Sequence, residues 1–322
     1  MRMSVYAVLA AFCFGAVLGK ILLPVLHKLK FGQNIYELAP EAHKKKQGTP
    51  TMGGFVIAGA ALLSSLVFGL LSDGEKLPLL LMLVLAVANL LLGFADDMTK
   101  IRQKHNQGLT PKQKLAVQTI LALLFAIYCY FSPSVGSKII IPFLKKELDL
   151  GILYIPITAF IIVGTTNSAN LLDGLDGLLT SVSYVDFAAL AVLCVLAGQL
   201  PLGAGCGALM GGCLAFLLYN AYPAKVFMGD TGSMFIGGAV SACAVLLRQP
   251  LLLLFIGFWM MMSSLSDLIQ FAYFRATHGK RIFKMAPIHH HFELSGMHEV
   301  KIVAMYMTTT IILSLIAVLS VY

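Results

Sequence analysis

The chain has 322 residues, of which 58% are hydrophobic and only 12% are charged, and its mean hydropathy is +0.86. Soluble domains carry about 25% charged residues, so this composition excludes a water-soluble globule, and its hydrophobicity excludes a disordered chain. The apolar stretches are continuous and do not alternate with a period of two, which argues against a membrane β-barrel. The sequence therefore predicts an all-α polytopic membrane protein with one integral membrane domain, residues 1–322.

Ten apolar stretches are candidates for membrane-spanning helices, because about 20 apolar residues cross a bilayer core. The first follows Arg2 and is too long for the apolar region of a signal peptide. All six cysteines lie inside apolar stretches without CxxC spacing, so we expect small buried residues with no disulfide or metal role. The expected spans are 3–26, 52–71, 77–95, 115–131, 152–168, 178–197, 203–219, 234–247, 251–271 and 302–321.

Basic residues are distributed unequally between the two sets of loops that these spans define. One set holds 16 of the 23 lysines and arginines, whereas the N-terminus and the opposite loops hold 6. The positive-inside rule places the basic set in the cytoplasm and both termini outside. All eight histidines and the aspartate-rich motifs also fall on the expected cytoplasmic side. The net charge of +8 therefore indicates a membrane face, or a polyanionic substrate there, and requires no nucleic-acid partner.

Two adjacent aspartates, Asp96 and Asp97, end the third expected span in the sequence GFADDMTK. They could be solvated end charges, but acidic groups at the C-terminus of a helix oppose its dipole. Adjacent carboxylates also repel each other unless a cation or a substrate compensates them. We therefore favour a functional role for this pair.

The stretch NSANLLDGLDG, residues 167–177, combines two amides, two carboxylates and two glycines between apolar runs. On a helical turn Asp173 and Asp176 would share a face, and glycines let backbone N–H groups approach a ligand. The alternative is a polar connection between helices, which would hardly need so many acceptors without a cation. The stretch predicts a metal ion or a donor-rich ligand.

The sequence NAYPAKVFMGDTGS, residues 220–233, presents Asp230 in a tight loop after Pro223 breaks a span. Asp-Thr-Gly also occurs in aspartic proteases, but those are soluble β proteins. A metal-binding aspartate fits better beside the other acidic loops.

Three consecutive histidines, His289, His290 and His291, lie in the last long loop in the sequence APIHHHFE. Zinc-binding helices place histidines at i and i+4, whereas in an extended segment His289 and His291 share one side and His290 opposes them. We expect this cluster to hold phosphate oxygens rather than a transition metal. A solvated loop is the less favoured alternative.

A lysine run, residues 44–46, precedes the segment GTPTMGG at the start of the second expected span. A positive-inside anchor explains the lysines, but the Gly/Thr segment is typical of a turn that contacts phosphate or sugar, without the residue order of a P-loop. The basic residues after Asp97 have the same two interpretations: Lys100, Lys112 and Lys114.

Polar residues are rare inside the expected spans, where Asp186 is the clear exception and Asn89 a weaker one. A secondary transporter of an anionic metabolite should place polar groups near the midplane on several spans. Chemistry at one membrane face is therefore the better interpretation.

In their order along the chain, KKKQGTPTMGG, GFADDMTK, NSANLLDGLDG, VFMGDTGS and APIHHHFE resemble the phospho-N-acetylmuramoyl-pentapeptide transferase family. This family belongs to the polyprenyl-phosphate N-acetylhexosamine-1-phosphate transferase superfamily, and the resemblance covers nearly the whole chain. The aspartate pair and DGLDG are common to the superfamily, whereas HHHFE indicates the muramoyl-pentapeptide branch. A related GlcNAc-1-phosphate transferase is the alternative.

The resemblance implies a multi-pass enzyme of the bacterial inner membrane, in contact with membrane lipids. Its reaction would convert UDP-N-acetylmuramoyl-pentapeptide and undecaprenyl phosphate to lipid I and UMP with Mg²⁺. The donor would explain the basic loops, and the acidic clusters would need a divalent ion as a bridge to its pyrophosphate. A homodimer is left open.

The resemblance also implies residue roles. Asp230 would bind magnesium, and Asp97, with Asp96, would orient or deprotonate the lipid phosphate. Residues around the uridine end, where Phe227 could stack on uracil, would be Asn170, Asp173, Gly174, Leu175, Asp176, Asn220, Phe227 and Gln270. Residues that meet the phosphates and the sugar would be Lys46, Thr51, His289, His290 and His291, together with Lys100 and either Lys112 or Lys114.

Overall fold

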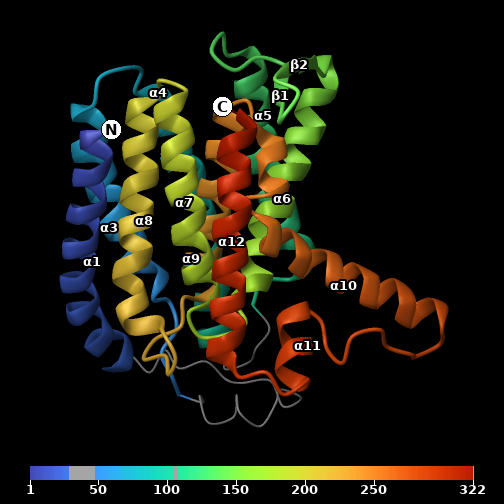
Figure 1. Cartoon of the computed structure of the whole chain (residues 1–322). Coiled ribbons are helices and arrows are strands. Elements are labelled where there is room, and N and C mark those ends of the chain that lie inside the picture. Colours follow the sequence, from blue (N-terminus) through green and yellow to red (C-terminus); the bar gives the residue numbers. More distant parts are fainter. Residues whose placement is uncertain (29–47, 104–107, 322) are drawn as a thin grey trace.

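The computed structural model describes residues 1–28, 48–103 and 108–321. Most of these residues form helices that run along one common axis as a bundle, with both termini at the same end (Figure 1). The long elements are α1 (Arg2–Lys28), α3 (Gly54–Ser64) with its π-helical extension η1 (Ser65–Gly69), α4 (Leu77–Gln103), α5 (Pro111–Phe131), α6 (Tyr154–Leu172), α7 (Leu178–Leu196), α8 (Leu200–Asn220), α9 (Gly229–Leu246), α10 (Phe258–Ala276) and α12 (Glu299–Val321). The short ones are β1 (Lys138–Ile141), β2 (Lys146–Asp149), α11 (Ile288–Leu294) and the 3₁₀ turns η2 (Gly151–Leu153) and η3 (Pro250–Leu254).

The structure confirms an all-α polytopic membrane protein. Eight of the ten expected spans coincide with helices that are long and apolar enough to cross a membrane, and the second coincides with the shorter apolar segment Gly54–Gly69. The ninth, 251–271, differs from the prediction. It is divided into η3 and α10, and α10 projects sideways from the bundle (Figure 1). Asp267 and Gln270 are further polar exceptions inside an expected span, in addition to Asp186 and Asn89. They interrupt the apolar run of α10, so it does not qualify as an apolar span.

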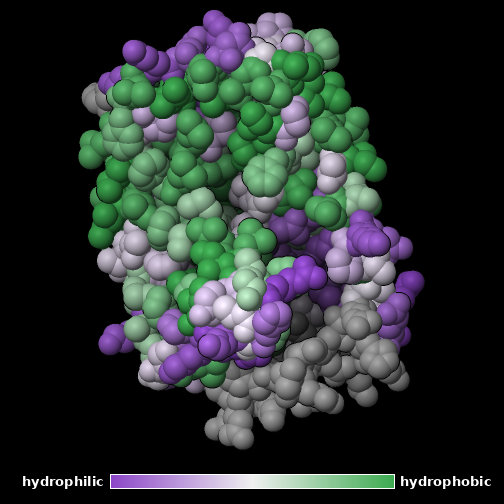
Figure 2. Space-filling model, turned by 90° about the vertical axis from the view of Figure 1, so that its right-hand side faces the viewer, coloured by the Kyte–Doolittle hydropathy of each residue, from purple (hydrophilic) through white to green (hydrophobic). Residues whose placement is uncertain are grey.

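The surface of the bundle is apolar around its middle. Figure 2 shows a broad hydrophobic band, with hydrophilic side chains gathered at both ends. Large apolar side chains are exposed on several of the long helices, for example Leu9 on α1, Leu124 on α5 and Leu315 on α12. A soluble monomer rarely leaves so continuous an apolar surface open to water, so this band is the part of the molecule that lipid covers.

Helix α9 lies in the centre of the bundle and packs against α3, α4, α6 and α7. Its side chains from Thr231 to Leu246 are all buried. Small residues allow backbones to approach closely in a membrane bundle, and Gly93 on α4 shows how closely. A Cβ atom at Gly93 would lie 2.2 Å from the carbonyl oxygen of Asp230. This contact fixes the first turn of α9 against α4.

Candidate active site

Three carboxylates converge at the end of the bundle opposite the termini. Asp96 and Asp97 lie near the C-terminal end of α4, and Asp230 lies in the first turn of α9. One oxygen atom from each lies within 4.8 Å of the others. Both α4 aspartates are 3% exposed. The structure therefore brings Asp230 to the adjacent pair Asp96 and Asp97, from which it is far apart in the sequence.

Asp97 caps α9 from a neighbouring helix. Its Oδ1 accepts the backbone N–H of Asp230 at 3.2 Å, and its Oδ2 accepts the backbone N–H of Thr231 at 2.9 Å and the hydroxyl of Thr231 at 2.7 Å. The first N–H groups of a helix have no partner within it, and an anion there also interacts favourably with the dipole. The bonds hold the first turn of α9, and with it Asp230, against α4.

Gly229 makes this close approach possible. Its φ angle is +73°, and a Cβ atom there would lie 2.6 Å from both Asp97 Oδ2 and Thr51 Oγ1. Both the positive φ angle and the lack of space exclude a side chain at position 229. Thr51, which the sequence placed in the site, therefore does lie beside Asp97.

Two lysines compensate part of the negative charge. Lys100 Nζ lies 2.7 Å from Asp96 Oδ2 and 3.2 Å from Asp230 Oδ2, and Lys114 Nζ lies 2.6 Å from the same oxygen of Asp230. Lys112, two residues before Lys114 on α5, is exposed. Of the two alternatives that the sequence left open, the structure brings Lys114 to the carboxylates.

Asn170, near the end of α6, completes the surroundings of Asp230. Its Nδ2 donates to Asp230 Oδ1 and to Ser233 Oγ, both at 2.8 Å. Sequence reasoning did not single out Ser233 or Thr231. Their hydroxyls follow the aspartate in GDTGS within one helical turn, and that spacing was the signal that could have found them.

The donor atoms suit a hard divalent cation. Carboxylate oxygens are the ligands that Mg²⁺ uses in proteins, often beside substrate phosphates. The ammonium groups of Lys100 and Lys114 already lie against these oxygens, which indicates that the cluster attracts cations. Since two ammonium groups face three carboxylates, one negative charge remains for a further cation. Asp96, Asp97 and Asp230 could therefore hold a metal ion.

The loop 173–177 joins α6 to α7 beside this cluster. Burial, together with the charges of Asp230 and Asp97, raises the pKa of the Asp173 carboxyl to about 8. Asp176 instead accepts the backbone N–H of Ala224 at 2.9 Å, and Leu175 is buried. The helical turn proposed for this stretch is wrong, because α6 ends at Leu172. Asp173 interacts with the acidic cluster, whereas Asp176 fastens the loop to the segment after α8.

Two predicted amides are engaged by the protein itself. Asn220 accepts the Thr180 hydroxyl at 2.8 Å and donates to the Val226 carbonyl at 3.0 Å. Gln270 donates to the carbonyl of Phe283 and accepts the backbone N–H of the same residue, both at 3.0 Å. Both side chains order loops at this end of the bundle. The half-buried Phe227 is held by its backbone, whose N–H donates to Pro50 at 2.8 Å.

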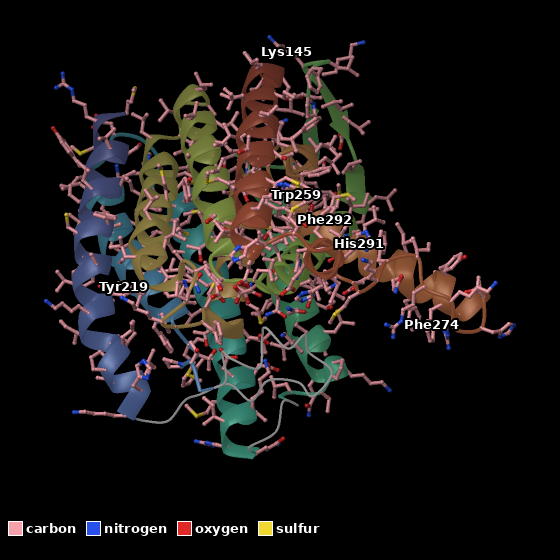
Figure 3. The ribbon with its side chains drawn as sticks, turned by 60° about the horizontal axis from the view of Figure 1, so that its bottom comes forward. Lys145, Tyr219, Trp259, Phe274, His291 and Phe292 are labelled. Atoms are coloured by element: carbon pink, nitrogen blue, oxygen red, sulfur yellow. The ribbon has the colours of Figure 1, made fainter. Side chains whose placement is uncertain are left out.

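The three histidines lie on a short helix, α11, and not on an extended segment. The expectation that His289 and His291 share one side is therefore wrong, because consecutive helical residues point in different directions. His289 is fully buried, and a Cβ atom at Gly174 would lie 2.2 Å from its Nε2. His290 Nδ1 lies 3.1 Å from Glu293 Oε2, and His291 Nδ1 accepts the backbone N–H of Lys284 at 3.2 Å. Figure 3 shows His291 on this short helix near the start of α10, whose far end carries Phe274.

Two further points complete the placement of the predicted residues. Lys46 lies outside the described residues.

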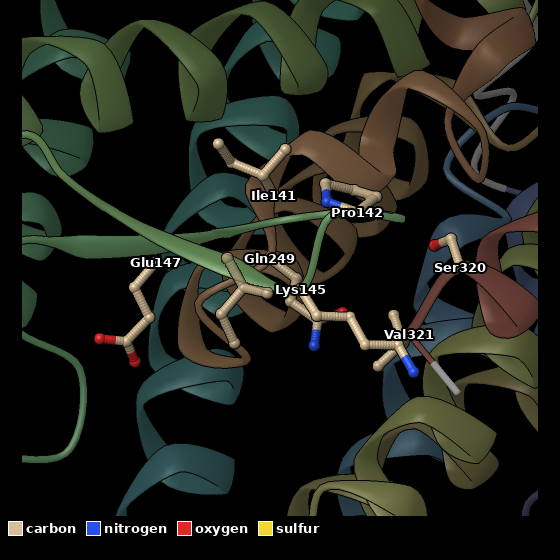
Figure 4. Close-up of a pocket in the computed structure, with 8 residues that line it drawn as sticks. Ile141, Pro142, Lys145, Glu147, Gln249, Ser320 and Val321 are labelled. Atoms are coloured by element: carbon tan, nitrogen blue, oxygen red, sulfur yellow. The ribbon is translucent and has the colours of Figure 1, made fainter.

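A pocket of about 260 Å³ lies at the other end of the bundle, between the β1–β2 hairpin and the end of α12 (Figure 4). It contains no predicted site residue; its lining is Ile140, Ile141, Pro142, Lys145, Glu147, Gln249, Ser320 and Val321.

Residues 79–248 match the model of the glycosyl transferase family 4. Several curated relatives are named phospho-N-acetylmuramoyl-pentapeptide-transferase. One from Clostridium novyi (strain NT) is 45% identical over 99% of this chain and 97% of its own length. One from Clostridium kluyveri (strain NBRC 12016) is 44% identical over 98% of both, and one from Clostridium perfringens (strain SM101 / Type A) is 44% identical over 97% of this chain and 95% of its own. The chain is therefore a multi-pass bacterial membrane protein that belongs to the phospho-N-acetylmuramoyl-pentapeptide transferase family.

Proposed function

We propose that this enzyme transfers phospho-N-acetylmuramoyl-pentapeptide from its UDP donor to undecaprenyl phosphate, which yields lipid I and UMP for peptidoglycan synthesis. The observation that carries the proposal is the convergence of Asp96, Asp97 and Asp230 with Lys100 and Lys114 where apolar helices end. A polyprenyl acceptor stays in the bilayer and a nucleotide donor arrives from water, so their reaction needs charged groups at a membrane surface. The basic loops favour the cytoplasmic side.

Asp230 is the residue that we assign to Mg²⁺, with Asp96 and Asp97 beside it. A bound ion would neutralise charge on the donor pyrophosphate. Lys100 and Lys114, which lie 3.2 and 2.6 Å from Asp230 Oδ2, are placed to contact phosphate oxygens of the donor or the acceptor. Asn170 fixes the rotamer of Asp230 through a 2.8 Å hydrogen bond. Phosphoryl transfer depends mainly on such positioning and charge neutralisation.

The acceptor needs little activation. A phosphate monoester has a second pKa near 6, so undecaprenyl phosphate is largely dianionic at neutral pH. One of its oxygens can attack the donor phosphorus that bears the sugar, while the bond from that phosphorus to the oxygen of the leaving UMP breaks. Three donors from α9 already occupy the Asp97 carboxylate. We therefore assign Asp97 to orienting the site rather than to removing a proton.

The remaining predicted residues are assigned to donor recognition. Asp173, Gly174, Leu175 and Asp176 would form the loop that faces the uridine end, and Phe227 would stack on uracil. Asn220 and Gln270 would act through the loops that they hold. His289 would act beside Gly174, and Thr51 beside Asp97.

The test is release of UMP by the purified enzyme in proteoliposomes that contain undecaprenyl phosphate. We expect release from UDP-N-acetylmuramoyl-pentapeptide, loss on chelation with EDTA, and recovery with added Mg²⁺. Use of UDP-GlcNAc in place of the muramoyl donor would favour the related GlcNAc-1-phosphate transferase. Uptake of the intact donor into sealed vesicles without UMP release would contradict an enzymatic function.

A further inference from the structure

The pocket at the end of the bundle that carries the termini is built from three separate parts of the chain. The β1–β2 hairpin, the connection from α9 to η3 and the last turn of α12 each contribute residues to it. In Figure 4, Gln249 and Lys145 lie between Glu147 on one side and Ser320 and Val321 on the other. The acidic cluster lies at the opposite end of the bundle, so the transferase reaction does not account for this pocket.

Hydrogen bonds hold the walls of the pocket together. The backbone N–H of Ile140 donates to the carbonyl of Arg248 at 2.8 Å, and that of Phe143 donates to the carbonyl of Ser320 at 3.0 Å. The guanidinium group of Arg248 also donates to Glu147 Oε1 at 2.7 Å. These bonds fasten the hairpin to both other parts of the chain, and the pocket therefore has fixed walls.

Gln249 brings a buried acceptor atom to the pocket. Its side chain is 6% exposed, and its Oε1 has no hydrogen-bond partner among the described residues. A buried acceptor without a partner is unfavourable, so a ligand with an N–H or O–H group would be stabilised here. Ser320, which is also buried and lines the pocket, donates to the carbonyl of Ala317 at 2.7 Å, and its hydroxyl oxygen can still accept a bond. The buried part of the lining therefore favours a hydrogen-bond donor.

The charge around the pocket favours an anionic group at its rim. The hairpin and the residue before Gln249 carry four basic and two acidic side chains, a net charge of +2: Lys138, Lys145, Lys146, Arg248, Glu147 and Asp149. Glu147 lies 2.7 Å from Arg248 and 3.4 Å from Lys138, so its charge is compensated. Lys145 is exposed and lines the pocket. Its ammonium group is placed to bind phosphate oxygens.

The surroundings of the pocket favour a lipid over a soluble ligand. Phe143 and Leu144 at the turn of the hairpin, and Leu319 on α12, are more than half exposed. Each lies next to a lining residue in the sequence. The acyl chains of a lipid whose head group occupies the pocket would cover these side chains, whereas a soluble ligand would leave them in water.

We propose that this pocket binds the head group of an anionic phospholipid that carries a hydrogen-bond donor, phosphatidylglycerol. Its phosphate would lie against Lys145, and a hydroxyl of its terminal glycerol would donate to Gln249 Oε1. Basic pockets at a membrane surface recognise anionic head groups by such contacts. The distribution of basic loops favours the outer leaflet for this end of the bundle. The proposal does not depend on the transferase reaction.

The experiment is native mass spectrometry of the purified full chain with an equimolar mixture of phosphatidylglycerol and phosphatidylcholine. Phosphatidylcholine has the phosphate but no N–H or O–H donor and no net charge. We expect one tightly retained phosphatidylglycerol per chain, with about 10-fold preference over phosphatidylcholine. Lys145→Gln should lower the affinity for phosphatidylglycerol about 10-fold, and Gln249→Leu about 5-fold. The matched control is Lys146→Gln, which removes an exposed lysine of the same hairpin that does not line the pocket and should bind like the wild type.

Equal affinity of the wild-type protein for the two lipids would overturn the proposal, and so would equal losses in Lys145→Gln and Lys146→Gln. Retention of the soluble head group glycerophosphoglycerol as firmly as the intact lipid would overturn the assignment to a lipid. Thermal unfolding checks the fold of each variant. If Gln249→Leu does not fold, the comparison of Lys145→Gln with Lys146→Gln decides alone.

Discussion

The two ends of the bundle both contain close ion pairs, but they differ in what surrounds those pairs. At the end opposite the termini, Lys114 lies 2.6 Å from Asp230, and the two side chains are 16% and 14% exposed. At the other end, Arg248 lies 2.7 Å from Glu147, which is 46% exposed and belongs to the β1–β2 hairpin. The distances are nearly equal, so distance alone does not identify a functional site. The degree of burial does identify the functional site. Buried carboxylates require a compensating charge, whereas exposed ion pairs are screened by solvent and contribute little to stability.

Neutralising Asp230 should have the largest effect on activity. Asp230→Asn keeps the shape of the side chain but removes the charge that faces Lys100 and Lys114 and that we assign to Mg²⁺. We expect a loss of at least about 10³-fold in turnover, at the upper end for removal of one electrostatic group from an active site. UMP release measures it, and α-helical circular dichroism checks the fold. The matched change at the other end, Glu147→Gln, should leave turnover unchanged. Similar losses in both variants would remove the distinction between the two ends.

The two candidate lysines of α5 give a comparison within one helix. Lys114→Gln removes the ammonium group that contacts Asp230, whereas Lys112→Gln changes an exposed side chain. We expect Lys114→Gln to lower turnover about 100-fold and Lys112→Gln to have almost no effect. The same UMP assay measures both variants. An equal loss in the two would mean that general positive charge near the membrane matters, and not the specific contact.

Much of the fold could be predicted from the sequence, because the bilayer imposes a length and a composition on each span. The ninth span shows the limit of that method. Residues 251–271 are apolar enough to resemble one span, but the structure starts with η3 and turns before α10 begins at Phe258. Hydropathy reports how well a segment tolerates lipid, and it does not report its direction. The sideways course of α10 depends on packing that no single segment encodes.

The site was predictable in its residue types but not in all their partners. Adjacent carboxylates at the end of an expected span identified Asp96 and Asp97, since such a pair is unfavourable unless a cation or a substrate compensates it. The three hydrogen bonds from Asp230 and Thr231 to Asp97 depend on how α9 docks onto α4. The histidine motif was found, but its conformation was not, because seven residues with three histidines have no strong preference for a helix.

The histidines should show smaller and unequal effects. His289 is fully buried against Gly174, while His290 and His291 interact with Glu293 and the Lys284 backbone. His289→Ala should lower turnover about 10-fold by loosening the loop 173–177, in the range for residues that orient a site. His290→Ala and His291→Ala should each lower turnover by a smaller factor. Steady-state kinetics with the muramoyl donor measure all three, and elemental analysis should find no zinc bound to the histidines. Equal losses in the three variants, or bound zinc that disappears in His289→Ala, would contradict this order.

The smallest expected effect is on how the thermal stability of the protein depends on pH. One aspartate at each end of the bundle tests it. Burial and the nearby carboxylates raise the pKa of Asp173 to about 8, while the unfolded chain has the ordinary value of about 3.9. Between these values the folded protein keeps a proton that the unfolded chain has lost, so unfolding becomes more favourable as the pH rises. Without divalent cations, the wild-type midpoint of thermal unfolding should therefore fall from pH 5 to pH 8 more steeply than that of Asp173→Asn. Fluorescence of the single tryptophan, Trp259, which stacks on Tyr306, follows the transition.

Asp149 at the opposite end provides the control with the opposite sign. Hydrogen bonds from the Ser137 hydroxyl and the Gly151 backbone lower its pKa. Its contribution to stability is therefore complete above the ordinary value of about 3.9 and is lost only as the pH falls below it. Asp149→Asn should follow the wild-type slope between pH 5 and pH 8. If Asp173→Asn also follows that slope, the Asp173 carboxyl does not share the electrostatic surroundings of Asp97 and Asp230. The acidic site would then end at the three carboxylates of α4 and α9.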